Sequence, residues 1–591
     1  MKIEETIQSF LSEVGILGEF VPYVTRFIFP VLAILIFFRC LLPLMSGGRR
    51  TKPWAYLTIA GGDARPLTHW ENSIGRSPSC DVVINIPSIS RIHAVVTRRS
   101  NKWTISDLNS TGGVTINGEA AIGQCLISRY DDVKLAGLPI SIVPVTEEFD
   151  DEYEDKFEEK RLFERLAENA ARIAARFGAG TTLLLIILFQ ILGGLTLVVL
   201  AAGSEISLKI PFVFLLYVLL ELVYFAGTRF AGRKYIEPEL LAFFLSGISL
   251  FVCASTNPEA MVKQFVAVLL GLVLLLVLQF FLKYPERARG ARYVFAGGAL
   301  LLLAANLLLA TAQNGALNWI RIGSLSLQPS ELVKVAFIFA GGATLDRLLS
   351  SRNFMKFMIF SGGCILALVI MRDFGGAMIF FITFVVITFM RSGDIKKLSL
   401  LIGMAVAGAA IVVSFLPYIT ARFSVWRHAW EFSDTTGYQQ VRTMIYAASG
   451  GLFGVGPGDG ALRYVAAADT DLVFGLLAEE WGLLVALVCA LVPLALAVFA
   501  FLSVKSSRSA FYAIVACGAA TLFLVQASLN IFGSFDLLPL TGVTLPFVSN
   551  GGSSMLSCWG LIACIKSIDE RHRAQSLPYE DENDYEEDDY E

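Results

Sequence analysis

Long apolar runs are the feature that most constrains how this chain can fold. From residue 181 onward, apolar stretches rich in Leu, Val, Phe, Ala and Gly follow one another with short polar breaks. A helix needs about 20 mainly apolar residues to cross the hydrocarbon core of a bilayer. Hydrophobic residues make up 55% of the 591 positions, and charged residues only 17%. The pattern predicts a polytopic, all-α membrane protein.

Twelve spans are expected in this region, with one more near the N-terminus. That first span is expected at 22–45, because the flank SGGRRTK follows it as a stop-transfer signal. No cleavable signal peptide is expected, since residues 1–20 lack a basic segment before a long apolar core. The twelve spans are expected near 181–202, 210–228, 239–255, 260–283, 292–311, 330–347, 357–371, 376–390, 398–416, 472–502, 511–531 and 545–566.

Lys and Arg in alternate loops predict the orientation of the spans. The loops TRFAGRK (228–234), KYPERARGAR (283–292) and RSGDIKK (391–397) are basic, and the loops between them are poorer in Lys and Arg. Cytoplasmic loops carry the excess of positive charge. We therefore expect 417–471 on the extracytoplasmic side and the C-terminus in the cytoplasm.

Between the first span and the others, the pattern changes to short alternating runs separated by Gly, Ser, Asn and Pro. Such runs, as in WAYLTIA and IHAVVTR, predict an all-β sandwich inserted into the helical chain. The expected domains are an anchor helix (1–50), a cytoplasmic sandwich (53–146), an acidic linker with a polar helix (147–180), a polytopic membrane domain (181–568) and an acidic cytoplasmic tail (569–591).

The sandwich carries the residues IGRSPSCDVVI, SISRIH and DLNSTGGVTING, which resemble a forkhead-associated (FHA) domain. FHA domains bind phosphothreonine peptides, so the resemblance implies a threonine-phosphorylated partner protein. It places Arg76 and Ser90 on the phosphate, with Arg91 and Thr111 assisting and His93 bracing the loops. The family often has Asn where this chain has Gly112. A purely structural sandwich is the alternative.

Polar motifs occur at the edges of the apolar runs. They include NWIRIGSLSLQPSELVK (318–334), MRDFGGAM (371–378), DTDLVFGLLAEEWG (469–482) and LPLTGVTLPFVSNGGSS (538–554). Ionisable groups at membrane depth are costly and mark a pathway or a site by default. Broken backbone at that depth must line a cavity or be buried in protein. These motifs therefore predict a functional site in the helical domain.

Taken together, the motifs QPSE, GYQ, TD-x-x-F, EE-x-G and LP-x-x-S-x-GGSS resemble the SEDS family (shape, elongation, division and sporulation) of RodA and FtsW. Members are glycosyltransferases that polymerise lipid II into peptidoglycan. Five spans are expected between the linker and NWIR, where the family usually has three, so two extra helices are expected. The implied substrate-binding residues are Arg321, Glu331, Lys334, Asp373, Arg442 and Asp471, although each alone is also explained by a helix-packing ion pair.

The loop WRHAWEFSDTTGYQQ (426–440) departs from the family pattern. Its Trp residues and GYQ match, but Phe432 stands where the family has the Asp that acts as catalytic base. Phe cannot accept a proton. Carboxylates stand beside it at Glu431 and Asp434, and either is a candidate catalytic base.

Three functions stay open from the sequence. The first is an active lipid II polymerase in a bacterial plasma membrane, acting with a class B penicillin-binding transpeptidase. The second is a non-catalytic scaffold of the same fold, and the third is a flippase for lipid-linked precursors. No nucleic acid partner is expected at a net charge of −4. No metal cluster is visible among the scattered Cys and His, although a divalent cation on the diphosphate is possible.

Overall fold

The computed structural model describes most of the chain between residues 15 and 569. The undescribed parts include the whole tail, most of the expected linker and much of the expected span at 398–416, so these predictions lie outside the described residues. Within 15–569 the undescribed residues are 46–52, 60–62, 70, 78–79, 100–101, 129, 146–177, 201–208, 234, 314–315, 324, 346–350, 393–395, 397, 405–406, 409–416, 505–506 and 508.

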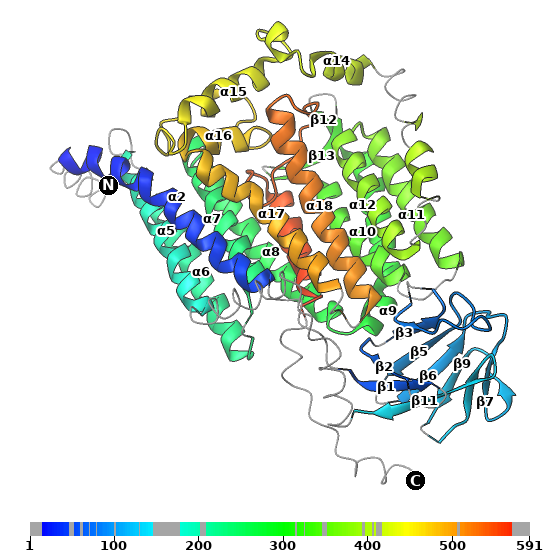
Figure 1. Ribbon diagram of the computed structural model, residues 1–591. Helices are drawn as coiled ribbons and strands as arrows, with labels where there is room; N and C mark the ends of the chain where they lie inside the picture. Colours follow the sequence, from blue (N-terminus) through cyan, green and yellow to red (C-terminus); the bar gives the residue numbers. More distant parts are fainter. Residues whose placement is uncertain are drawn as a thin grey trace. The chain divides into compact units, whose positions relative to one another are not determined.

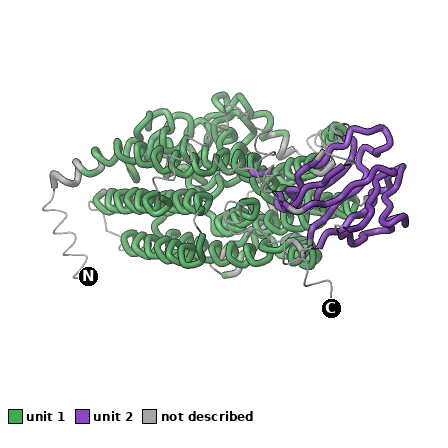
Figure 2. Tube along the Cα trace, turned by 60° about the horizontal axis from the view of Figure 1, so that its bottom comes forward, with its two compact units in different colours: residues 1–47, 169–502, 513–569 green, residues 48–168, 503–512, 570–591 purple. Residues whose placement is uncertain are grey.

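The chain divides into two compact units (Figure 2). One unit comprises residues 1–47, 169–502 and 513–569 and is mainly helical. The other comprises residues 48–168, 503–512 and 570–591 and contains a β-sandwich.

The sandwich has two sheets. The six-stranded sheet has the order β2-β1-β11-β10-β7-β8, and the five-stranded sheet has the order β4-β3-β5-β6-β9. Alternate side chains such as Leu57, Ile74, Val96 and Leu135 are buried in one core. The strands are β1 (Ala55–Ile59), β2 (Asp63–Leu67), β3 (Glu71–Gly75), β4 (Val82–Val83), β5 (Ala94–Arg99), β6 (Lys102–Asp107), β7 (Val114–Ile116), β8 (Glu119–Ala120), β9 (Gln124–Ile127), β10 (Val133–Leu135) and β11 (Leu138–Pro144).

The helical unit is that of a multi-pass membrane protein. Its described residues contain nine helices that are long and apolar enough to cross a bilayer, besides the shorter apolar helix Phe374–Met390. The main helices are α2 (Gly15–Met45), α5 (Ala179–Leu200), α6 (Lys209–Phe230), α7 (Glu237–Thr256), α8 (Ala260–Leu282), α9 (Pro285–Leu309), α10 (Pro329–Leu345), α11 (Ser351–Ile370), α12 (Phe374–Ser392), α17 (Leu483–Ser503), α18 (Ala510–Ser534) and α19 (Gly552–Lys566).

Helix α7 lies at the centre of one side of this unit, and nearly all its residues are buried. It packs against α2 and α5 on one side and against α8 and α19 on the other. Helices α2, α5 and α6 stand beside it (Figure 1). An apolar cluster joins them, in which Phe29 of α2 contacts Phe189 of α5 with ring centroids 5.3 Å apart.

Three expectations were wrong in detail. The span expected at 472–502 is two helices, α16 (Val473–Glu480) and α17, because the chain turns at Gly482 with a φ of 88°. A Cβ at Gly482 would lie 2.4 Å from the Leu452 carbonyl oxygen. The helix expected from 545 begins only at Gly552. The stretch between the spans expected at 292–311 and 330–347 forms a three-stranded sheet of β12 (Thr311–Gln313), β13 (Ala316–Ile322) and β14 (Leu325–Leu327).

Candidate functional site

A buried ion pair lies in the first turns of α10. The Lys334 Nζ donates to Glu331 Oε1 at 2.6 Å and to Gln526 Oε1 of α18 at 2.9 Å. Lys334 and Glu331 are only 2% and 6% exposed. A buried charge persists only where a counter-charge and hydrogen bonds replace water. The QPSE motif therefore places one cation and one carboxylate, mutually neutralised, inside the helical unit.

The broken segment before α19 completes this network. Gln526 Nε2 donates to the carbonyl and hydroxyl oxygens of Thr544 at 3.0 and 3.1 Å. The Ser557 hydroxyl donates to Glu331 Oε2 at 3.1 Å. The Ser553 hydroxyl accepts from the Gln328 backbone N–H at 3.0 Å. The Ser-rich motif thus supplies the donors and acceptors that irregular backbone needs when it is buried.

Asp373 belongs to the same cluster. It follows Arg372, whose φ is 61°, and its Oδ1 accepts from the Gly376 backbone N–H at 2.8 Å. This contact caps the start of α12. Burial raises the pKa of Asp373, and the Gly376 hydrogen bond and the nearby Lys334 cation counteract it. Three predicted residues, Glu331, Lys334 and Asp373, are therefore brought together.

Arg422 and Asp471 form a second polar group, which lies against the segment between α18 and α19. The Arg422 guanidinium, on α14 (Pro417–Val425), donates to the Leu540 carbonyl at 2.7 Å. Asn530 of α18 donates to the backbone carbonyls of Asp471 and Val543, at 3.0 and 2.8 Å. Burial raises the pKa of Asp471 from its ordinary 3.8 to about 6, although the Arg422 charge lowers it.

The loop WRHAWEFSDTTGYQQ is held by a residue that sequence reasoning missed. Asp536, 9% exposed, accepts from the backbone N–H groups of Arg427 and Ala429 at 3.0 and 3.2 Å. The Trp426 indole N–H donates to the Leu537 carbonyl at 3.0 Å. Asp536 lies more than a hundred residues from its partners in the sequence, and no local pattern distinguishes it from an ordinary turn residue.

Phe432 packs in a small apolar cluster. It ends the short 3₁₀ helix η2 (Ala429–Phe432), and its half-buried ring packs against the cluster of Val425, Ala429 and Val441. Sterics explain why the first residue of GYQ is glycine, since a Cβ on Gly437 would lie 2.4 Å from the Ala429 carbonyl oxygen. A packed aromatic ring therefore stands at the position where the resemblance predicts an Asp.

The two neighbouring carboxylates, Glu431 and Asp434, are both exposed. Neither carboxylate has a hydrogen-bond or ion-pair partner among the described residues. Arg442, on α15 (Tyr438–Gly450), stacks over the Tyr438 ring at 5.2 Å. Arg321 is exposed on β13. No contact given for Glu431, Asp434 or Arg442 among the described residues joins them to the buried cluster.

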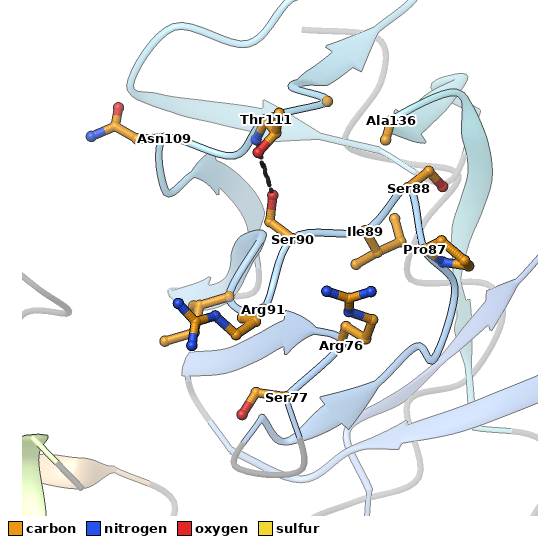
Figure 3. A pocket seen from close by; sticks show the side chains of 12 residues that line it. Arg76, Ser77, Pro87, Ser88, Ile89, Ser90, Arg91, Asn109, Thr111 and Ala136 are labelled. Atoms are coloured by element: carbon orange, nitrogen blue, oxygen red, sulfur yellow. Dashed lines mark hydrogen bonds between the residues drawn. The ribbon is translucent and has the colours of Figure 1, made fainter. Parts of the chain in front are cut away.

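The sandwich carries an open pocket of ≈ 940 Å³ formed by the loops at one end (Figure 3). All four residues predicted for the phosphate line it: Arg76, Ser90, Arg91 and Thr111. The Thr111 backbone N–H donates to Ser90 Oγ at 2.9 Å, and Figure 3 shows the two hydroxyls facing one another. Guanidinium groups and hydroxyls converging from loops on a rigid sandwich suit an anion such as phosphate.

His93 has the bracing position expected for it. It is fully buried, and its ring bonds the Ser90 N–H, the Gly113 carbonyl and the Ser110 hydroxyl at 3.1, 3.0 and 3.1 Å. The imidazole thus joins the loops that carry Ser90 and Thr111 and holds the pocket in shape. Elsewhere, the part of the chain that the structure describes has no group of three His, Cys, Asp or Glu residues able to hold a metal.

Two family models match the chain. The FtsW/RodA/SpoVE model, described as "Cell cycle protein", matches residues 240–574, and the FHA domain model matches residues 72–134. Helices α2, α5 and α6 all precede the first match, and the two extra helices expected before NWIR stay a prediction.

Curated relatives are similar to about half of the chain. Peptidoglycan glycosyltransferase RodA of Mycobacterium tuberculosis (strain H37Rv) is 28% identical over 329 residues, which cover 52% of this chain and 69% of the relative. The probable peptidoglycan glycosyltransferase FtsW of Coxiella burnetii is 33% identical over 276 residues, covering 45% and 74%. The crystal structure of Thermus thermophilus RodA aligns at 23% identity with a TM-score of 0.42, covering 58% and 98%.

Replacing Asp536 by Ala is expected to loosen the loop that it holds. The buried Ala429 N–H loses its acceptor, at about 1–3 kcal/mol, and the partly buried Arg427 N–H loses its acceptor as well. Hydrogen exchange of peptides covering 426–432 should therefore rise in Asp536→Ala. The matched control is Asp434→Ala, which removes an exposed carboxylate of the same type without a described partner. Equal protection of the loop in Asp536→Ala and the unsubstituted protein would contradict the assignment.

Proposed function

This chain belongs to the FtsW/RodA/SpoVE family of cell cycle proteins, and from that premise we propose that it polymerises lipid II into peptidoglycan strands. The observation that carries the proposal is the buried cluster of Glu331, Lys334, Gln526 and Asp373 in the matched region. Curated relatives covered for more than two thirds of their length are named peptidoglycan glycosyltransferases.

The reaction joins two lipid-linked sugars. The 4-hydroxyl of the acceptor attacks the anomeric carbon of the donor, a new C–O bond forms, and the bond to the lipid diphosphate breaks. A carboxylate takes the hydroxyl proton, and cationic groups stabilise the departing diphosphate. We assign the cationic role to Lys334 and Arg422, with Arg321 and Arg442 as further candidates. A divalent cation could share this role, and we assign no metal ligand.

Three carboxylates are candidates for the base. Glu431 and Asp434 flank Phe432, and their exposure leaves them accessible to a bound acceptor. Asp471 is the third candidate, because it stands beside Arg422 and the Gly542 turn; a Cβ on Gly542 would lie 3.4 Å from its Oδ2. Each would be a divergent solution for a family site that has lost its Asp.

One observation favours a second function. The half-buried Phe432 ring packs against an apolar cluster where the family resemblance puts an acid. A chain without a base would keep the fold and the lipid-binding surface and act as a scaffold for lipid II or for a class B transpeptidase.

Polymerisation by the purified full-length protein separates these functions. Reconstituted protein supplied with lipid II is expected to produce glycan chains, alone or with a partner transpeptidase. Lys334→Met should reduce the rate by about a hundredfold or more, because it leaves Glu331 buried without its counter-charge and removes the cation. A protein that makes no polymer under any of these conditions is a scaffold, or a flippase if it speeds lipid II exchange across vesicles.

The base is identified by three variants and a pH profile. The variants are Glu431→Gln, Asp434→Asn and Asp471→Asn. The one that removes the base should lose about 10²–10⁴-fold in polymerisation rate, and the other two should stay near the rate of the unsubstituted protein. If Asp471 is the base, the rate should fall as pH drops below about 6, since its carboxylate then gains a proton. A rate that is flat across that pH range while Asp471→Asn is inactive would contradict this role.

For the sandwich we propose binding of a phosphothreonine protein in the cytoplasm. The N-terminal helix would anchor it to the membrane, and the loop 417–471 would lie outside. The pocket chemistry supports binding of a phosphothreonine, since one pocket is lined by Arg76, Ser90, Arg91 and Thr111.

Cysteine labelling from outside intact cells tests the orientation. A cysteine introduced at Glu431 should react with the reagent, and one introduced at Asn109 should not.

Arg76→Ala should weaken phosphothreonine-peptide binding by about tenfold to a hundredfold, because a hydrogen bond to a charged group is worth about 1.5–3 kcal/mol. Arg76→Lys should recover part of the affinity, since it keeps the charge and loses the fork geometry. Lys134→Ala is the control, because it removes a cation of the same sandwich that does not line the pocket. Calorimetry with phosphorylated and unphosphorylated peptides measures this, and unchanged affinity in Arg76→Ala would remove the proposed role.

A further inference from the structure

An acidic side chain lies in the middle of a helix that precedes the family match. Glu221 is on α6, whose span runs from Lys209 to Phe230, and it is 1% exposed. An ionisable group at membrane depth is costly and is retained for a reason. This residue is outside the buried cluster around Lys334 and has no part in the proposed polymerisation.

The partners of Glu221 are uncharged. Gln190 Nε2 of α5 donates to Glu221 Oε1 at 2.6 Å, in a contact where both residues are 1% exposed. Gln190 in turn lies against α7, because a Cβ on Gly247 would be 3.0 Å from its Nε2. Tyr217, one turn before Glu221 on α6, interacts with it electrostatically and donates its hydroxyl to the Phe243 carbonyl at 2.7 Å. Among the described residues no Lys, Arg or His contacts Glu221.

Two atoms of this pair have no hydrogen-bond partner. They are Glu221 Oε2 and Gln190 Oε1, both buried. Both atoms are hydrogen-bond acceptors when Glu221 is a carboxylate, so no hydrogen is present to form a bond between them, and both are buried away from water. A proton on the carboxyl supplies that hydrogen, since the acid O–H can donate to the amide oxygen. It also removes a charge that no described cation balances.

We propose that Glu221 is a proton-binding site, and that its neutral acid form joins α6 to α5 and, through Gln190, to α7. The ligand is a proton, and the site lies in helices that precede residues 240–574. Helix α7 carries Ser249, whose hydroxyl accepts from Gln264 at 2.8 Å and donates to the Ser549 carbonyl at 3.4 Å. Helices α5 and α6, which precede the family match, are thus joined to the same helix that supports the broken segment at 544–551.

Infrared spectroscopy tests the protonation state directly. Full-length protein in lipid nanodiscs near neutral pH should show a carbonyl band of a protonated carboxylic acid that disappears in Glu221→Gln. In Glu331→Gln no such band should disappear, because Glu331 is paired with Lys334. Gln190→Leu should keep the Glu221 band and shift it, because one hydrogen bond to the carbonyl is lost. Identical spectra for the unsubstituted protein and Glu221→Gln would overturn the proposal.

Thermal unfolding gives an independent measurement. Glu221→Gln imitates the neutral acid in size and polarity and should keep the melting temperature close to that of the unsubstituted protein. Glu221→Ala removes the partner of Gln190 and should lower it. If Gln and Ala lower the melting temperature equally, the carboxylate charge is what matters, and the proton-binding site is disproved.

Discussion

The ion pair of Glu331 and Lys334 is the interaction on which the helical unit depends. Burying an unpaired charge inside a membrane protein costs several kcal/mol of free energy. Each of these groups therefore requires the other and requires further hydrogen-bond donors and acceptors. The structure supplies them from helices far apart in the chain: Gln526 from α18 and Ser557 from α19. The pair therefore fixes how α10, α18 and α19 meet, and Asp373 at the start of α12 joins them electrostatically.

The same requirement explains the broken backbone before α19. A segment without regular hydrogen bonding is tolerated at depth only if side chains satisfy its polar groups. Gln526 and Asn530, one turn apart on α18, both donate to carbonyls of this segment. On its other side, Ser249 and Gln264 reach the Ser549 carbonyl from α7 and α8. Polar side chains that look out of place in apolar helices therefore hold the site's backbone.

Much of the fold was predictable because its determinants are local. Apolar length predicts spans, and alternation with Gly and Pro predicts strands. The errors came where a distant contact overrides the local pattern. The turn at Gly482 lies inside an apolar run, and its reason is the close approach of Leu452 from another part of the chain. Nothing in the local sequence predicts the role of Asp536, because it accepts hydrogen bonds from two N–H groups of a loop over a hundred residues away.

The sequence by itself determined the class of the protein, its inserted sandwich, and the residue types at its candidate sites. Through the family resemblance it also predicts an acid at the position of Phe432, a side chain that cannot accept a proton. Only the tertiary structure decided which of those residues meet. It assembled Glu331, Lys334 and Asp373, left Glu431 and Asp434 exposed, and enclosed Glu221 with Gln190. The physical reason is that burial and pairing depend on helices packing across long sequence separations, which no local pattern encodes.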